Sequence, residues 1–253
     1  MSGDGARRPR VAVFRPDDER IESAVELLRS LGAEPVADPM LEVEPTGAVP
    51  ADAPLVVFTS KTGVELAAEA SWEPGDADLA AIGPATAAAA REAGWTVDVV
   101  PDEYTSAGLV AALEPRVAGE RVVVARSDHG SDVLLDGLRE AGAEVTETVL
   151  YRLARPADAG DSAAAAAAGD LDAAAFTSSL TVDNFLAAAA DRGVEDAARA
   201  GLANAVVGAI GPPTAETAAD RGVDVDVVPD EASFERLATA VVDALDVEST
   251  HHD

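Results

Sequence analysis

Short apolar runs alternate along this chain with longer stretches in which apolar residues have helical spacing. Apolar runs at 11–14, 55–58, 79–82 and 97–100 each lead into a turn that contains glycine, proline, serine, threonine or aspartate. An alanine- and leucine-rich stretch follows such turns. Strands that alternate with helices predict βαβ units, and continuous apolar strands are typical of parallel sheets buried on both faces. The pattern therefore predicts an α/β fold with helices on both sides of parallel sheets.

The ends of the expected helices carry the residues that begin and stop helices. Residues that cap helix starts are Asp17 or Asp18, Ser60 or Thr62, and Thr105 or Ser106. Glycines where helices are expected to end are Gly32, Gly94, Gly142 and Gly222. Both patterns support the division of the chain into alternating strands and helices.

The chain contains an internal repeat. Four blocks recur in the same order, with 10–34 matching 121–144, 56–66 matching 174–184, 81–88 matching 209–216, and 97–109 matching 225–237. Ordered recurrence of this kind indicates a duplicated structural unit. Two short apolar-alternating segments bounded by proline, 39–45 and 149–156, each follow the first part of a repeat. We expect them to be linker strands that pair with each other where the chain crosses between two domains and returns.

Composition excludes several classes of protein. The chain has 253 residues with 18 basic and 47 acidic side chains, a formal net charge of −29, and no cysteine. Disulfides, zinc–thiolate sites and thiol catalysis are excluded. The charge disfavours a nucleic-acid partner, and we expect neither a signal peptide nor a membrane span. The acidic residues spread over the whole length, which fits adaptation to a high-salt cytoplasm better than an acidic interaction tail.

Two turn sequences at expected strand ends are candidates for binding anions. FTS stands at 58–60 and 176–178, and IGP with a nearby threonine stands at 82–84 and 210–212, in matching blocks of the repeat. Ligands of parallel sheets bind beyond the carboxyl ends of the strands, where helix N-termini offer free N–H groups. The turns have the features of carboxylate or phosphate cradles without a nucleotide motif. A structural helix cap is the alternative for each hydroxyl.

The ordered set of motifs resembles the uroporphyrinogen-III synthase family. It comprises the FTS turns, the AIG-x-x-T turn, VPDE followed by Tyr or Ala, a tyrosine in the second linker, and a first strand ending in Arg-Pro. The resemblance implies two flavodoxin-like α/β domains joined by a two-stranded antiparallel linker. Domain 1 would be 1–38 and 155–253, the linker 39–45 and 149–154, and domain 2 46–148.

The resemblance also implies an activity. The family closes the linear tetrapyrrole hydroxymethylbilane to a macrocycle in a cleft between its domains, with inversion of ring D and loss of water. No cofactor or metal is needed. We expect a cytoplasmic monomer on the route to heme and cobalamin. A transient contact with hydroxymethylbilane synthase is left open, and neither nucleic acid nor membrane is an expected partner.

Tyr151 is the expected catalytic residue, since it matches the linker tyrosine of the family. A phenol keeps its proton at neutral pH and can assist departure of the hydroxyl group. Packing of the aromatic ring between domains is the alternative. Tyr104, the only other tyrosine, is expected to be structural or at the rim of the site.

The resemblance also implies a set of substrate-binding residues in the repeated turns. These are Ser60, Lys61, Thr62, Thr86, Ser178, Ser179, Leu180 and Thr214. Helix capping competes with substrate binding for Thr86 and Thr214. Lys61 is the only lysine of the chain, and we expect it to bind a carboxylate, although its position could be chance.

Two arginines stand at equivalent positions of the repeat. Arg15 and Arg126 follow matching strands and are expected to bind substrate carboxylates. Salt bridges to Asp17 and Asp128 are the alternative. His129 has no assigned role, and His251 and His252 lie in a polar tail.

The same sequence features are compatible with a binding protein that is not an enzyme. A two-domain module that binds a tetrapyrrole or another polycarboxylate without catalysis could use the same scaffold. The linker tyrosine together with both IGP turns favours the enzyme.

Overall fold

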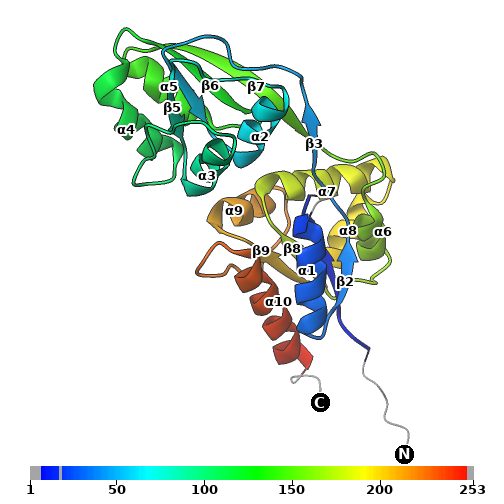
Figure 1. Ribbon diagram of the computed structural model, residues 1–253. Helices are drawn as coiled ribbons and strands as arrows, with labels where there is room; N and C mark the ends of the chain where they lie inside the picture. Colours follow the sequence, from blue (N-terminus) through cyan, green and yellow to red (C-terminus); the bar gives the residue numbers. More distant parts are fainter. Residues whose placement is uncertain (1–6, 17–18, 250–253) are drawn as a thin grey trace, which may run out of the picture. The chain divides into compact units, whose positions relative to one another are not determined.

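The computed structural model describes residues 7–16 and 19–249. The chain forms two compact units, where unit 1 is Met1–Glu42 with Ala154–Asp253 and unit 2 is Val43–Leu153. Each unit is built on a sheet with helices on both of its faces (Figure 1). The predicted α/β class with parallel sheets is confirmed. Asp17, Asp18, His251 and His252 lie outside the described residues.

Unit 1 contains a four-stranded sheet in the order β2-β1-β8-β9. Its strands are β1 (Arg10–Val13), β2 (Glu34–Ala37), β8 (Ala173–Phe176) and β9 (Val206–Ala209). Every neighbouring pair is parallel. The carboxyl ends of these four strands therefore lie along one edge of the sheet.

Alternate residues of the strands of unit 1 form two cores. Val11, Val13 and Ala173 pack on one face, which α1 (Glu19–Ser30) and α10 (Phe234–Ser249) cover. Ala12, Phe14 and Phe176 pack on the other face. The helices that supply side chains there are α6 (Asp161–Ala167), α7 (Ser179–Asp191), α8 (Glu195–Leu202) and α9 (Pro212–Asp220). The period of two along a strand explains why both cores need apolar residues.

Unit 2 contains a five-stranded sheet in the order β3-β7-β6-β4-β5. The strands are β3 (Glu42–Pro45), β4 (Leu55–Phe58), β5 (Asp78–Ala81), β6 (Arg121–Ser127) and β7 (Glu144–Ala154). The pairs β4–β5, β4–β6 and β6–β7 are parallel. On one face lie α4 (Ser106–Val117) and α5 (Asp132–Glu140), and on the other α2 (Lys61–Glu69) and α3 (Pro84–Glu92).

The prediction of a strand at 97–100 is wrong. Val99 forms only an isolated parallel bridge to Ala80, and Val227 forms the matching bridge to Gly208. The Asp98 carboxylate accepts a hydrogen bond from Leu79 N at 2.8 Å, so a side chain takes the place of a further ladder bond. Asp226 does the same for Val207 N. The segment therefore lies at the sheet edge as an extended turn.

The predicted pairing of the two linker segments is present, because β3 lies beside β7 in the sheet and Thr46 N donates to Leu150 O at 3.0 Å. The expectation that 149–154 is a separate strand is wrong. These residues are the second half of β7, which begins at Glu144 and pairs with β6 as far as Ser127↔Tyr151. The register shifts between Arg126 and Ser127, and Asp128 N then donates to Tyr151 O at 3.2 Å. The first segment supplies β3, which joins the same sheet beside β7. Continued pairing with β6 keeps the returning segment inside the sheet of unit 2.

Several predicted helix ends are confirmed. Ser60 caps α2 by accepting from Gly63 N, and Thr105 caps α4 by accepting from Gly108 N, each at 3.0 Å. The predicted terminal glycines have positive φ, as in the 88° of Gly32 and the 90° of Gly142. A residue with a Cβ is strained in that conformation.

A buried carboxylate joins the two parts of the chain that make up unit 1. Asp38, which is 4% exposed, follows β2. It accepts hydrogen bonds from Gly160 N at 3.0 Å and Ser162 N at 2.8 Å, and also from the Ser162 hydroxyl. These donors are at the start of α6, where the helix N-terminus favours an anion. Asp38 therefore holds the returning chain against the end of β2.

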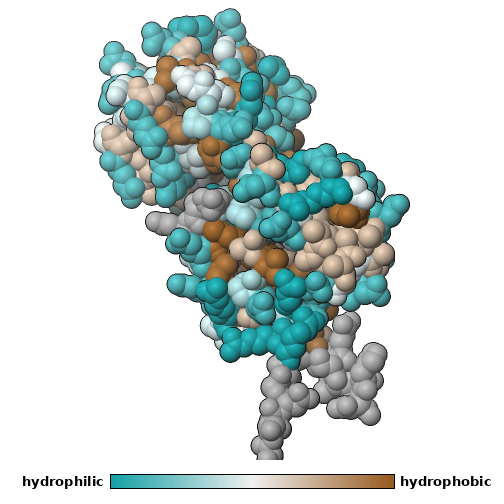
Figure 2. All heavy atoms as spheres, turned by 90° about the vertical axis from the view of Figure 1, so that its right-hand side faces the viewer, coloured by the Kyte–Doolittle hydropathy of each residue, from teal (hydrophilic) through white to brown (hydrophobic). Residues whose placement is uncertain are grey.

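The visible surface is mostly polar. Figure 2 shows hydrophilic residues over most of the face in view, with apolar residues in smaller patches. No helix among residues 7–16 and 19–249 is long and apolar enough to cross a membrane.

Replacing Asp38 with alanine should destabilise unit 1. The Asp38→Ala change leaves the N–H groups of Gly160 and Ser162 buried without their acceptor, which should lower the free energy of unfolding by about 3 kcal/mol. Urea unfolding followed by circular dichroism measures the loss. The matched control is Asp220→Ala at an exposed carboxylate, for which we expect a change within about 0.5 kcal/mol. Equal stability of the two variants would contradict the buried role of Asp38.

Candidate functional site

A polar cavity lies at the carboxyl edge of the sheet of unit 2. Its volume is about 180 Å³, and serine and threonine side chains contribute much of its wall. The lining residues are Thr59, Ser60, Ile82, Ser106, Arg126, Ser127, Gly130, Ser131, Leu134 and Tyr151. They follow β4, β5 and β6, lie at the end of β6 or on β7, or belong to the first turns of α4 and α5. This is the edge at which parallel sheets bind ligands.

Tyr151 contributes a phenol to this cavity. It is 7% exposed, and its ring belongs to the apolar cluster that includes Phe58 and Leu150. Its hydroxyl lies 3.0 Å from Ser60 Oγ. Ser60 Oγ also accepts from Gly63 N as the cap of α2. The aromatic body is therefore fixed by packing while the hydroxyl is held at the wall of the cavity.

Arg126 is a buried cation beside these hydroxyls. The residue is 4% exposed. Its Nε donates to Glu147 Oε1 at 2.5 Å and its Nη1 to Ser131 O at 2.7 Å, while Nη2 lies 3.5 Å from Asp132 Oδ1. The alternative of a salt bridge from Arg126 to Asp128 is wrong, because these three groups contact the guanidinium instead. Charge-assisted hydrogen bonds on three nitrogens fix its orientation.

Gly130 allows this position of Arg126. A Cβ at Gly130 would lie 2.5 Å from Arg126 Cδ and 2.8 Å from Arg126 Nη1. Contacts this short require the guanidinium to shift, so the absence of a side chain at residue 130 is part of the geometry of the site.

Asp128 and His129 form a pair on the outer side of the same turn. His129 Nδ1 lies 2.8 Å from Asp128 Oδ1, which also accepts from Leu153 N at 3.1 Å. Partial burial acts to raise the pKa of Asp128, but the hydrogen bond to His129 and the one from Leu153 outweigh it. The pKa of Asp128 therefore lies below its usual value. The carboxylate stays ionised and fastens the turn to β7.

The two predicted threonines do not cap their helices. Thr86 and Thr214 are each 4% exposed, and the helix caps are Gly83 and Gly211 without a side-chain hydrogen bond. Capping by the threonines, one of the alternatives, is therefore wrong. A proline follows each capping glycine and supplies the fixed φ that begins the helix.

The second FTS turn, in unit 1, is held by its own side chains. Ser178 and Thr181 form a reciprocal capping box at the start of α7. Ser179 Oγ donates to Pro213 O at 3.1 Å and accepts from Thr217 Oγ1 at 2.7 Å, which joins α7 to α9. Leu180 is half-buried on the first turn of α7.

The remaining predicted residues lie apart from the cavity lining. Lys61 is exposed on the first turn of α2, where its Nζ lies 3.3 Å from Glu65 Oε1, and Thr62 follows it half-buried. In unit 1, Arg15 Cζ lies 5.2 Å from the centroid of the Phe234 ring. Tyr104 is 61% exposed beside Gly83. The structure thus brings together Ser60, Arg126 and Tyr151, and neither Lys61, Thr62 nor Thr86 lines the same cavity.

Four polar residues of the cavity were not predicted as site residues. They are Thr59, Ser106, Ser127 and Ser131. Each ends or follows a strand, or begins a helix, at the carboxyl edge, and that common position is the signal that could have identified them. Nowhere in the described ranges is there a cluster of three or more His, Asp or Glu side chains suited to a metal ion.

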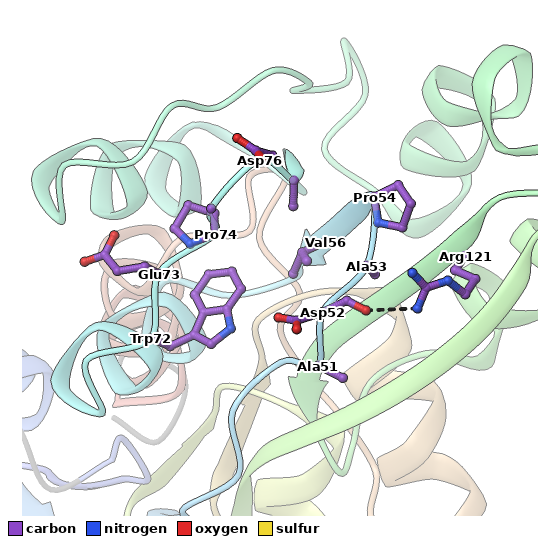
Figure 3. Close-up of a pocket in the computed structure, with 12 residues that line it drawn as sticks. Ala51, Asp52, Ala53, Pro54, Val56, Trp72, Glu73, Pro74, Asp76 and Arg121 are labelled. Carbon is purple, nitrogen blue, oxygen red and sulfur yellow. Dashed lines mark hydrogen bonds between the residues drawn. The ribbon is translucent and has the colours of Figure 1, made fainter.

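A second pocket of about 310 Å³ lies at the opposite edge of the same sheet (Figure 3). Its polar groups are engaged locally, since Arg121 Nη1 donates to Asp52 O at 3.1 Å and Trp72 Nε1 donates to Pro50 O at 2.9 Å. The amino ends of parallel strands are not the usual ligand edge. The polar groups of this pocket are therefore less suited to binding a ligand than those of the cavity around Tyr151.

Comparisons with known proteins identify close matches over most of the chain. The family model for uroporphyrinogen-III synthase HemD matches residues 22–239. A Methanothermobacter thermautotrophicus protein assigned as a uroporphyrinogen-III synthase is 34% identical over 248 residues, covering 91% of this chain and 96% of that protein. The uroporphyrinogen-III synthase of Synechococcus elongatus is 29% identical over 232 residues, covering 85% and 87%.

Solved structures share the fold at lower sequence identity. A mutant uroporphyrinogen III synthase from Thermus thermophilus superposes with a TM-score of 0.65 and 22% identity, covering 94% of this chain and 99% of that one. The uroporphyrinogen-III synthetase of Helicobacter pylori gives a TM-score of 0.61 and 16% identity, covering 95% and 100%. These two structures support the α/β architecture.

Proposed function

The chain belongs to the uroporphyrinogen-III synthase family, and from this membership we infer that it is a cyclising lyase that converts hydroxymethylbilane to uroporphyrinogen III. The reaction closes a linear tetrapyrrole, inverts ring D and releases water. The observation in this chain that supports it most directly is the buried Tyr151 hydroxyl, held against Ser60 at the wall of a polar cavity.

The first chemical need is departure of the substrate hydroxyl. An acid near that oxygen lets it leave as water, and the pyrrole nitrogen stabilises the azafulvenium cation that remains. We propose Tyr151 as this acid. Its ring is fixed among apolar side chains, so the hydroxyl does not have to be ordered when the substrate binds.

The second need is control over which carbon closes the ring. The cation must be attacked at the substituted carbon of ring D to give a spiro intermediate, which requires both ends of the substrate to be held in a bent geometry. The acetate and propionate groups of the substrate are the natural handles. Hydroxyls, N–H groups at helix starts and guanidinium groups bind carboxylates well.

The proposed carboxylate-binding residues come from both units. They are Arg15, Ser60, Lys61, Thr62, Thr86, Arg126, Ser178, Ser179, Leu180 and Thr214. Arg126 has the strongest support, because a buried and oriented cation lies at the cavity wall. The support for Thr86 and Thr214 is that capping glycines leave their hydroxyls free of that role.

Further properties belong to the same proposal. We propose that both units descend from one duplicated flavodoxin-like unit, that the protein acts as a monomer in the cytoplasm, and that its acidity is an adaptation to high salt. A module that binds tetrapyrroles without catalysis is not favoured by the family match.

A coupled assay in molar KCl tests the activity. Hydroxymethylbilane is generated in situ, the products are oxidised, and isomers I and III are separated by chromatography. We expect mainly isomer III in proportion to added protein, because unassisted closure gives isomer I. Isomer I alone, from protein shown to be folded in that salt, would reject the proposal.

Removing the Tyr151 hydroxyl should slow turnover. We expect Tyr151→Phe to lower kcat by about 100-fold, the lower end of what general acids contribute, with folding intact because the ring is kept. Steady-state kinetics of isomer III formation measure it. Tyr104→Phe, at the exposed tyrosine, is the matched control and should keep wild-type kcat. A wild-type kcat for Tyr151→Phe would contradict the acid role.

Removing the Lys61 ammonium should weaken substrate binding. Because Lys61 is 60% exposed in its side chain, we expect Lys61→Ala to raise KM only about two- to fivefold, with a smaller change in kcat. The control is Arg116→Ala, a loss of charge near the start of β5 at the other edge of the sheet. An unchanged KM for Lys61→Ala would exclude the carboxylate contact.

High salt should stabilise the fold. At a net charge of −29 the folded chain repels itself, and about 1 M salt shortens the screening length to about 3 Å. We expect Tm to rise steadily between low and molar KCl in thermal unfolding monitored by circular dichroism. A Tm that is flat or falls with KCl would remove the basis for the high-salt proposal.

A further inference from the structure

We propose that Ser60 is a positioning residue for Tyr151, which holds the phenol and stabilises its charge when it gives up a proton. This inference rests on the proposed function and departs from the expectation that Ser60 binds a substrate carboxylate. The alternative roles predict different kinetic effects, so they can be separated.

The two hydroxyls have a limited hydrogen-bonding capacity. A hydroxyl has one donor and two acceptor sites. In the structure Ser60 Oγ accepts hydrogen bonds from Gly63 N and from the Tyr151 hydroxyl, each at 3.0 Å, and rotation of both hydroxyls can reverse the second bond. Only one hydrogen can lie between the two oxygens. Whichever hydroxyl donates, the other keeps a hydrogen of its own for a different acceptor.

The remaining hydrogen can be offered to a ligand in the cavity. Both residues line it, and within the described ranges no other hydrogen-bond partner lies on either hydroxyl. When Ser60 donates to Tyr151, the phenol hydrogen is available to the substrate. The Ser60–Tyr151 pair can therefore donate one hydrogen bond into the cavity. The donor of that bond can be the tyrosine hydroxyl.

The position of Ser60 is fixed from several sides. As the cap of α2 it has extended backbone angles and a bonded Oγ. A Cβ at Gly63 would lie 3.1 Å from Ser60 Oγ and 3.2 Å from Leu150 Cδ1, so a side chain there would press on the Ser60 hydroxyl. A hydroxyl fixed in this way can orient the phenol without loss of entropy during the reaction.

Proton transfer from Tyr151 accompanies the loss of the substrate hydroxyl. Tyr151 gives its proton to the substrate hydroxyl, the C–O bond breaks with its electron pair leaving on oxygen, and water, an azafulvenium cation and a tyrosinate result. Ser60 donates its hydrogen bond to the tyrosinate oxygen. Carbon–carbon bond formation and rearomatisation later release one proton, which returns to the tyrosinate, so the net change is loss of one water.

The matching turn of unit 1 lacks this arrangement. Ser178 Oγ accepts from Thr181 N at 3.2 Å, and the Thr181 hydroxyl accepts from Ser178 N to complete the capping box. Helix capping alone accounts for the hydrogen bonds of Ser178. The phenol partner is the feature that sets Ser60 apart from its counterpart in the repeat.

A double-mutant cycle tests the inference. The variants are Ser60→Gly, Tyr151→Phe and the double variant, with Ser60→Thr as the conservative replacement that keeps the hydroxyl. Glycine is a tolerated helix cap, so Ser60→Gly should cost only a few tenths of a kcal/mol in stability. Thr105→Gly removes the equivalent cap of α4 and is the matched control. kcat, KM and the isomer ratio are measured for each in molar KCl.

We expect Ser60→Gly to lower kcat about tenfold with KM within about twofold, since a hydrogen bond to a charged oxygen is lost. In the Tyr151→Phe background the same change should have no effect on kcat, and Ser60→Thr should restore turnover. The inference is overturned by a raised KM with unchanged kcat, by the same kcat loss in both backgrounds, or by an equal loss in Thr105→Gly. A wild-type protein that makes only isomer I would instead reject the proposed function.

Discussion

The hydrogen-bond register of the parallel strands in unit 2 determines what can meet at its candidate site. Phe58 pairs with Ala125, and Ser127 pairs with Tyr151. These pairings bring the ends of β4 and β6 and the middle of β7 to one edge. Because parallel strands all end on the same side, the helix starts that follow them gather there as well. Separate segments thereby supply hydroxyls, a guanidinium and a phenol to a single cavity.

The same constraint explains why groups that stabilise the fold also line the candidate site. A helix start leaves N–H groups without partners, and a serine cap satisfies one of them. Ser60 meets this structural need and also contacts the Tyr151 hydroxyl. Arg126 behaves similarly, since burial of its charge requires Glu147 and the Ser131 carbonyl. Those partners hold the guanidinium in one orientation beside the cavity.

The two units repeat a pattern of strands and turns without repeating its side-chain contacts. Asp98 and Asp226 make the same hydrogen bond at the edges of their sheets, and Gly83 and Gly211 start equivalent helices. Around the FTS turns the contacts differ. Ser178 completes a capping box and Ser179 joins two helices of unit 1, whereas Ser60 meets a tyrosine. Local turn chemistry is conserved between the repeats because backbone geometry demands it, while the partner at each turn depends on the neighbouring strand.

The sequence by itself determined the α/β class, the caps Ser60 and Thr105 and the terminal glycines, because periodicity and turn chemistry are local properties. It also identified Tyr151, Ser60 and Arg126 as candidates. The tertiary structure alone decided that 149–154 continues β7 and that Arg126 pairs with Glu147 and not with Asp128. It also decided that the Asp98 carboxylate takes the place of a backbone acceptor at 97–100, where a strand was expected. These outcomes depend on which strands are neighbours and where the register shifts, and at these three positions the local sequence pattern does not specify the partner.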